Sequence, residues 1–93
     1  MYVIVFTSRA KRALKKYGKS GSFPKERYQS ALECLHARNR LPASYDDHAL
    51  SGELAKYREF HIAYDLLVQY ERDDDLRIVT IYRIGTHSEL FGS

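Results

Sequence analysis

The sequence has almost no cysteine and no long apolar run, and both absences narrow the class of protein. Cys34 is the only cysteine among 93 residues, so no disulfide can form within the chain. No apolar run approaches the ~20 residues needed to span a bilayer, and residues 1–6 lack the positive lead of a signal peptide. We therefore expect a cytoplasmic protein without membrane association, with Cys34 as a small core residue of a helix.

Repeats, low-complexity segments and linkers are also absent from the sequence, which argues against an extended or multidomain protein. A chain of 93 residues fits one domain, residues 1–93, with one modest core. The apolar fraction of 44% and the charged fraction of 29% are those of an ordinary soluble globular protein.

The net charge of +3 is unevenly distributed along the chain. Residues 1–45 hold ten Lys or Arg and two acids, a net of +8, whereas residues 46–93 hold five and ten, a net of −5. The first half is therefore a candidate phosphate-binding surface, although a solvated helix face gives the same pattern. The cationic side chains of the first predicted helix are Lys11, Arg12, Lys15, Lys16 and Lys19.

Hydrophobic periodicity predicts one strand, two helices and then at least three strands. Residues 2–6 are typical of a buried strand, and apolar residues at helical spacing predict helices over about 8–18 and 24–40. Residues 42–54 are polar and turn-rich, and strand patterns follow at about 56–64, 66–70 and 76–84, with a turn at 73–75. We expect an α+β fold whose late strands form an antiparallel meander with both helices packed on one face.

Three histidines lie on separate predicted elements, namely His48, His61 and His87, and Asp65 follows His61 by four residues. In one unbroken strand, residues four apart are ~13 Å from each other at ~3.3 Å per residue. A turn near residue 63 would bring His61 and Asp65 closer together. The natural meeting place of these side chains is the end of the sheet where the 42–54 loop and the C-terminal segment meet.

Metal-free RNA cleavage needs a base for the 2′-OH, an acid for the 5′-oxygen and a cation beside the phosphate. Histidine suits the first two roles, because its reference pKa of ~6.5 leaves both protonation forms populated near neutral pH. Arg83 suits the third role, since a guanidinium is permanently charged. An aspartate can orient a histidine or act as the base, and Tyr64 and Phe91 are candidates to stack on unpaired bases.

Each of these residues also has a simpler interpretation. A single histidine is more often a surface residue than a catalyst, His36 at the edge of a helical stripe is interpreted as structural, and Phe91 could be an apolar plug. Three histidines and an aspartate are compatible with a zinc site. The sequence has no short ligand pair such as H-x-x-x-H, which argues against metal.

Three strings between residues 47 and 91 carry a resemblance to a known family. They are Asp47-His48-x-Leu50-x-Gly52, Arg58-Glu59-x-His61-Ile62-x-x-Asp65-Leu66-Leu67 and Arg83-x-Gly85-Thr86-His87-Ser88-x-Leu90-Phe91. The combined pattern resembles the YafQ-like toxins of the RelE/ParE superfamily, most strongly over residues 42–91. One departure is Leu66, because the family often has tryptophan after this aspartate.

The resemblance implies a RelE-like fold and a type II toxin of a toxin–antitoxin pair. Such toxins are ribosome-dependent endoribonucleases that need no metal or other cofactor, cut mRNA in the ribosomal A site and leave a 2′,3′-cyclic phosphate. The residues that the resemblance implies are His48, His61, Asp65 and His87 for catalysis, with Arg83 and Phe91 for RNA contact. The basic first half would then hold ribosomal RNA.

The implied partners are an antitoxin protein, the ribosome and mRNA, with operator DNA reached only through the antitoxin. Alternatives on the same fold are a ParE-like inhibitor of DNA gyrase and a degenerate toxin that only binds its antitoxin. The set of histidines argues against a gyrase inhibitor, because a protein that acts only by binding does not need clustered titratable groups.

Overall fold

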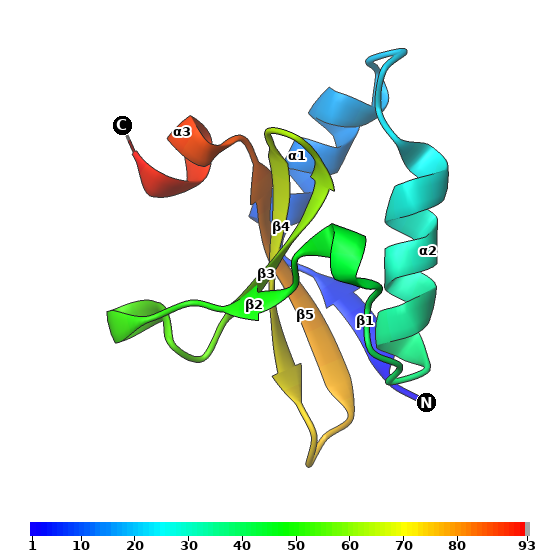
Figure 1. Cartoon of the computed structure of the whole chain (residues 1–93), viewed down its shortest axis with the longest axis vertical. Helices are drawn as coiled ribbons and strands as arrows, with labels where there is room; N and C mark the ends of the chain where they lie inside the picture. The colour runs from blue at the N-terminus through cyan, green and yellow to red at the C-terminus, as the bar shows by residue number, and fades with distance from the viewer. Residues whose placement is uncertain (93) are drawn as a thin grey trace.

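The computed structural model describes residues 1–92 and places them in one five-stranded sheet with helices packed against it (Figure 1). In chain order the elements are β1 (Val3–Phe6), α1 (Ser8–Gly18), α2 (Lys25–His36), the 3-10 turn η1 (Ala43–Tyr45), β2 (His48–Ala49), the 3-10 turn η2 (Gly52–Leu54), β3 (Arg58–Ala63), β4 (Leu66–Asp73), β5 (Ile78–Gly85) and α3 (His87–Phe91). No helix within this described part combines the length and apolarity that crossing a membrane requires.

The strands lie in the order β1-β5-β4-β3-β2. The late strands β3, β4 and β5 pair antiparallel, so the predicted meander is confirmed. The first strand β1 lies parallel to β5, with Val3 opposite Ile78. β5 is therefore a central strand, with β1 on one side and β4 on the other.

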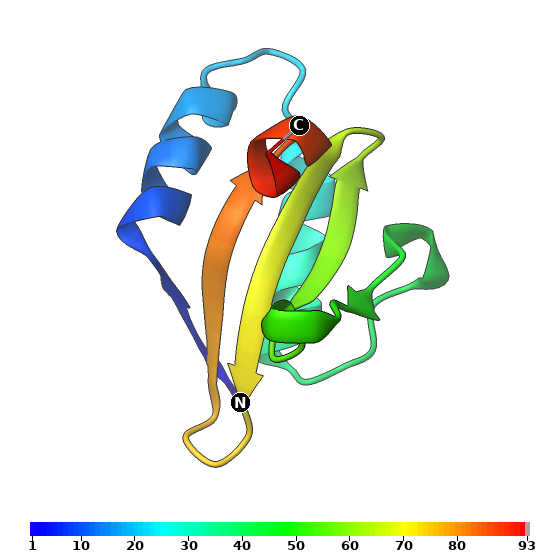
Figure 2. The ribbon, with the colours of Figure 1, turned by 90° about the vertical axis from the view of Figure 1, so that its left-hand side faces the viewer.

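The core lies between the sheet and the two long helices. In β3, Phe60 and Ile62 are buried in this core. Side chains alternate along a strand, so Glu59 and His61 lie on the opposite face of the sheet, which we call the second face. The core residues Ala10 of α1 and Ala31 of α2 belong to the same cluster. Both helices therefore pack on one face, as predicted, and Figure 2 shows α3 on the opposite side of the sheet from α2.

Local capping sets the bounds of the long helices. The Thr7 side chain accepts a hydrogen bond from the Ala10 amide at 3.0 Å and caps α1. α2 ends at His36 rather than near residue 40, because Arg38 takes a left-handed conformation, with φ 58°, and the Asn39 amide donates to the Cys34 carbonyl at 2.8 Å. The His36 ring donates to the carbonyl oxygen of Tyr2 over 2.6 Å, so the structural interpretation of His36 is confirmed.

Two short elements, one strand and one helix, were not predicted from the sequence. Within the polar segment 42–54, residues 48 and 49 form the short edge strand β2. Residues 87–91 form the short helix α3, which begins with a capping box between Thr86 and Glu89. A side chain at Gly85 would come within 3.2 Å of the Glu89 side chain, so glycine allows α3 to fold back on the end of β5.

α3 is anchored to the rest of the protein by Leu90, which is buried. Phe91, the next residue, is 48% exposed. The interpretation of Phe91 as an apolar plug is therefore wrong, because about half of this residue is open to solvent.

Candidate active site

The hairpin between β3 and β4 brings Asp65 to the N-terminus of α3. Ala63 pairs with Leu66 across a turn of two residues, so the turn predicted near residue 63 is confirmed. The Asp65 Oδ1 atom accepts hydrogen bonds from the His87 amide at 2.9 Å and from the His87 Nδ1 atom at 2.5 Å. These two bonds fix the orientation of the His87 ring and leave its Nε2 atom as the nitrogen available to a ligand.

The electrostatics of this pair favour an ionised aspartate. The backbone hydrogen bond from His87, followed by the side-chain hydrogen bond, holds the pKa of the Asp65 carboxyl below its usual range. The carboxylate is therefore negative near neutral pH and holds the His87 ring through its Nδ1 atom.

The three predicted histidines form a row across the second face of the sheet. The ring centroids of His61 and His87 are 5.8 Å apart, and those of His48 and His61 are 6.4 Å apart. The His61 Nδ1 atom lies 3.8 Å from the Asp46 carboxylate and has no hydrogen-bond partner. The gathering of these histidines at one place was predicted, and the structure brings them together.

His48 differs from the other two histidines because both of its ring nitrogens face oxygen atoms of the protein. Its Nδ1 atom donates to the Asp46 carbonyl at 2.7 Å, and its Nε2 atom lies 3.3 Å from the Glu59 carboxylate. Glu59 is buried and also accepts a hydrogen bond from Gln69 at 3.2 Å. The buried Glu59 side chain, itself bonded to Gln69, thus lies against the His48 ring and fixes its position.

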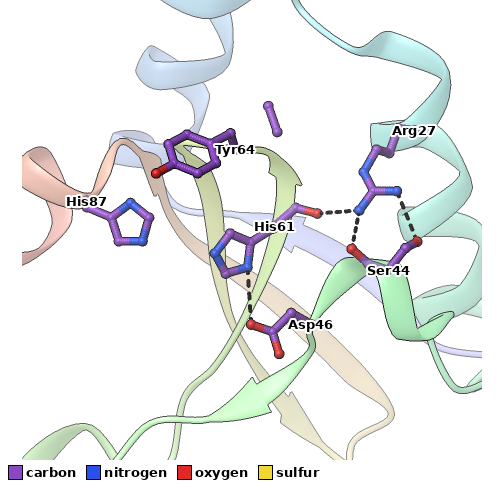
Figure 3. Close-up of a pocket in the computed structure, with 7 residues that line it drawn as sticks. Arg27, Ser44, Asp46, His61, Tyr64 and His87 are labelled. Carbon is purple, nitrogen blue, oxygen red and sulfur yellow. Dashed lines mark hydrogen bonds and ion pairs between the residues drawn. The ribbon is translucent and has the colours of Figure 1, made fainter.

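An open pocket of about 590 Å³ lies beside the row of histidines (Figure 3). Its walls come from α2, η1 and the loop after it, the β3–β4 hairpin and α3. The lining residues are Arg27, Ser44, Asp46, His61, Ala63, Tyr64 and His87. Two of the predicted histidines therefore line the pocket, together with Tyr64, a residue that is 96% exposed.

The predicted RNA-contacting residues other than Tyr64 lie outside this lining. Arg83 donates through Nη1 to the Leu90 carbonyl at 3.1 Å and through Nη2 to the Glu89 carbonyl at 2.9 Å. Its guanidinium therefore caps the C-terminal end of α3. The five basic side chains predicted for the first helix are exposed, with Lys19 just beyond the end of α1, and one of them, Lys16, pairs with Glu89 at 3.0 Å.

The sequence predictions omitted Arg27, Asp46 and Glu59. Arg27 and Asp46 reach the site through packing of α2 and η1 against β3, and no local pattern reveals this contact. Glu59 was detectable, because it stands two residues before His61 and side chains two apart share one face of a strand.

The three histidines and Asp65 do not converge on one point. Among residues 1–92, no three His, Cys, Asp or Glu side chains converge closely enough to hold a metal ion. The arrangement instead offers two imidazoles and a carboxylate at the edge of an open pocket, a set able to accept and donate protons.

The position of α3 depends on Glu89, which leads to a prediction about pH. Hydrogen bonds from the Tyr17 hydroxyl, the Thr86 amide and Lys16 hold the pKa of the Glu89 carboxyl at about 2, below its ordinary 4.5. A pKa lowered in the folded state stabilises the fold fully above about pH 4.5, and this contribution is lost as the pH falls toward 2. Glu89→Gln is therefore expected to flatten the pH dependence of stability over this range.

The free energy of unfolding, measured with urea at several pH values between 5 and 2, checks this prediction. Glu53→Gln is the matched control, because it removes an exposed carboxyl without touching α3. Equal pH slopes for Glu89→Gln and the unmodified protein would show that these contacts do not stabilise the fold.

The fold and the pocket together define a small α+β domain with a cluster of acid–base groups at one end of its sheet. Residues 2–92 match the family model for the bacterial toxin of type II toxin-antitoxin systems, YafQ. The chain therefore belongs to this family, and the resemblance seen in the sequence is confirmed.

Two curated relatives and one solved structure illustrate the similarity. A toxin named YafQ from Haemophilus influenzae is 40% identical over 65 residues, which are 68% of this chain and 64% of the relative. The mRNA interferase toxin YafQ of Escherichia coli is 40% identical over 52 residues, 56% of this chain and 54% of the relative. The matched segments thus span less than two thirds of either relative.

The solved structure is the Escherichia coli DinJ-YafQ complex, in which the similar chain has a TM-score of 0.85 and 26% identity. That comparison covers 99% of this chain and 100% of the other. The RelE-like α+β fold predicted from the sequence is therefore confirmed over almost the whole chain.

Proposed function

We propose that the protein is a toxin that cleaves mRNA in the ribosomal A site by acid–base catalysis. The observation that carries this proposal is the pocket in which His61 and His87 face each other, with Asp65 bonded to His87. Ring centroids 5.8 Å apart allow the two imidazoles to flank one phosphodiester, because each needs only to reach an oxygen at roughly 3 Å.

In the proposed reaction His61 is the base and His87 is the acid. His61 takes the proton of the 2′-OH, and the 2′-oxygen attacks the adjacent phosphorus. The bond from phosphorus to the 5′-oxygen breaks, and this oxygen takes a proton from His87. The products are a 2′,3′-cyclic phosphate and a 5′-OH, and no metal takes part.

His48 contributes differently in this proposal. Both of its ring nitrogens are engaged by Asp46 and Glu59, so it is an unsuitable base or acid. Its proposed role is to lie beside His61, with the two ring centroids 6.4 Å apart.

The relatives support the wider setting of the proposal. The Escherichia coli relative is named an mRNA interferase, and a similar chain was solved in complex with DinJ as a toxin–antitoxin pair. We infer that this protein acts in the cytoplasm with a cognate antitoxin, and reaches operator DNA only through it. The exposed basic side chains of α1 are the proposed contact with ribosomal RNA.

Purified ribosomes programmed with a defined mRNA test this function. We expect cuts at a codon placed in the A site, bearing 2′,3′-cyclic phosphate ends and unchanged when the purified toxin has first been treated with a chelator and dialysed. Intact mRNA together with stalled DNA gyrase would instead support the ParE-like alternative. Intact mRNA with unaffected gyrase and a stable antitoxin complex would indicate a degenerate toxin.

A further inference from the structure

Arg27 brings a positive charge to the proposed cleavage pocket from α2. Its Nη2 atom donates to the Ser44 carbonyl at 2.7 Å and to the His61 carbonyl at 3.1 Å, and its Nη1 atom donates to the Ser44 hydroxyl at 3.2 Å (Figure 3). The guanidinium also lies 3.8 Å from the centre of the Tyr45 ring. Arg27 is therefore held in one position against the strand that carries His61.

The charge of Arg27 has no partner of opposite sign in the described part of the chain. Among residues 1–92, no carboxylate forms an ion pair with it. A guanidinium has five N–H donors, and the three bonds above leave two of them free. A fixed and unpaired guanidinium beside a pocket attracts an anion.

Arg27 is also the lone Lys or Arg among the lining residues of the pocket. The sequence pattern points to Arg83 for this charge, but Arg83 donates to the Leu90 and Glu89 carbonyls at the C-terminal end of α3. Arg83 also lies outside the lining of the pocket that contains His61 and His87, so its charge is not presented to that pocket.

We propose that Arg27, and not Arg83, supplies the permanent positive charge of the pocket and binds a phosphate of the RNA strand beside His61. This inference rests on the proposed function, because it assumes that the pocket accepts RNA. Arg27 then completes the set of groups required for cleavage, namely a base, an acid and a cation.

The salt dependence of RNA binding tests this role. The probe is a short single-stranded RNA with 2′-O-methyl groups, which the protein cannot cleave, and its affinity is measured by fluorescence anisotropy at several salt concentrations. Each lost phosphate contact reduces the slope of log K against log[salt] by about 0.7 for a single strand. Arg27→Gln is expected to show this reduction and weaker binding, whereas Arg83→Gln keeps the slope of the unmodified protein.

Arg77→Gln is the matched control, since it removes the same charge from the exposed β4–β5 turn, far from the pocket (Figure 1). Arg27→Lys keeps the charge and is expected to retain the slope, which a purely structural role of Arg27 does not predict. If Arg27→Gln does not fold, the side-chain Nε–H resonance of Arg27 in the unmodified protein, followed by NMR during RNA titration, gives the answer.

An unchanged slope for Arg27→Gln, or an unshifted Arg27 resonance at saturating RNA, overturns the proposal. A reduced slope for Arg83→Gln alone assigns the contact to Arg83. If the unmodified protein cleaves A-site mRNA but Arg27→Gln leaves the salt slope of RNA binding unchanged, only this inference fails. If the unmodified protein neither binds nor cleaves RNA, the proposed function fails with it.

Discussion

Replacing His87 with alanine is expected to slow mRNA cleavage by roughly 10²–10⁴-fold, the usual contribution of a general acid or base. The reason is the position of the His87 ring. Asp65 holds its Nδ1 atom, and its Nε2 atom remains available to the leaving oxygen. The measurement is the single-turnover rate of cleavage of A-site mRNA on purified ribosomes.

His36→Ala is the matched control for this variant. His36 lies on α2 with its ring bonded to the Tyr2 carbonyl, outside the lining of the pocket. Its replacement should leave the cleavage rate within a few fold of the unmodified protein. A His87→Ala protein that keeps its circular dichroism spectrum and still cleaves at the unmodified rate would exclude His87 as the acid.

Replacing His61 with alanine is expected to cause a loss of similar size, roughly 10²–10⁴-fold, and to change the pH profile in a different way. A base must be unprotonated and an acid protonated, so the rate of the unmodified protein should fall on both sides of an optimum. Removal of the base His61 should abolish the fall on the acidic side, and removal of the acid His87 the fall on the alkaline side.

The measurement is the residual single-turnover cleavage rate of both variants across a range of pH. It decides whether His61 is the base and His87 the acid, or the reverse. If the limbs disappear in the opposite order, the roles of the two histidines are exchanged. If both variants keep a complete bell-shaped profile, neither ring transfers a proton in the rate-limiting step.

The sequence predicted the order of the main elements because their patterns are local. Apolar spacing in residues 8–18 and alternation at Phe60 and Ile62 reveal which face of each element is buried. β2 and α3 escaped prediction for a physical reason. A strand of two residues and a helix of five are too short to show a period, and both depend on contacts with β3 and β5.

The candidate site was only partly predictable for the same reason. The histidines and Asp65 were found because they are chemically distinctive residue types. Arg27 was not found, because it is one of many cations in the first half of the chain. Its special position depends on Ser44 and on the His61 carbonyl, which approach it only after α2 packs beside β3.

The parallel pairing of β1 with β5 has a consequence for the synthesis of the protein. Val3 and its partner Ile78 are 75 residues apart along the chain, so Val3 leaves the ribosome long before Ile78 does. Closing so long a loop is costly in chain entropy, and folds dominated by such distant pairings form slowly. Because His87 follows β5 directly, the groups that carry the proposed chemistry come together only after β5 has been synthesised and has paired with its neighbours.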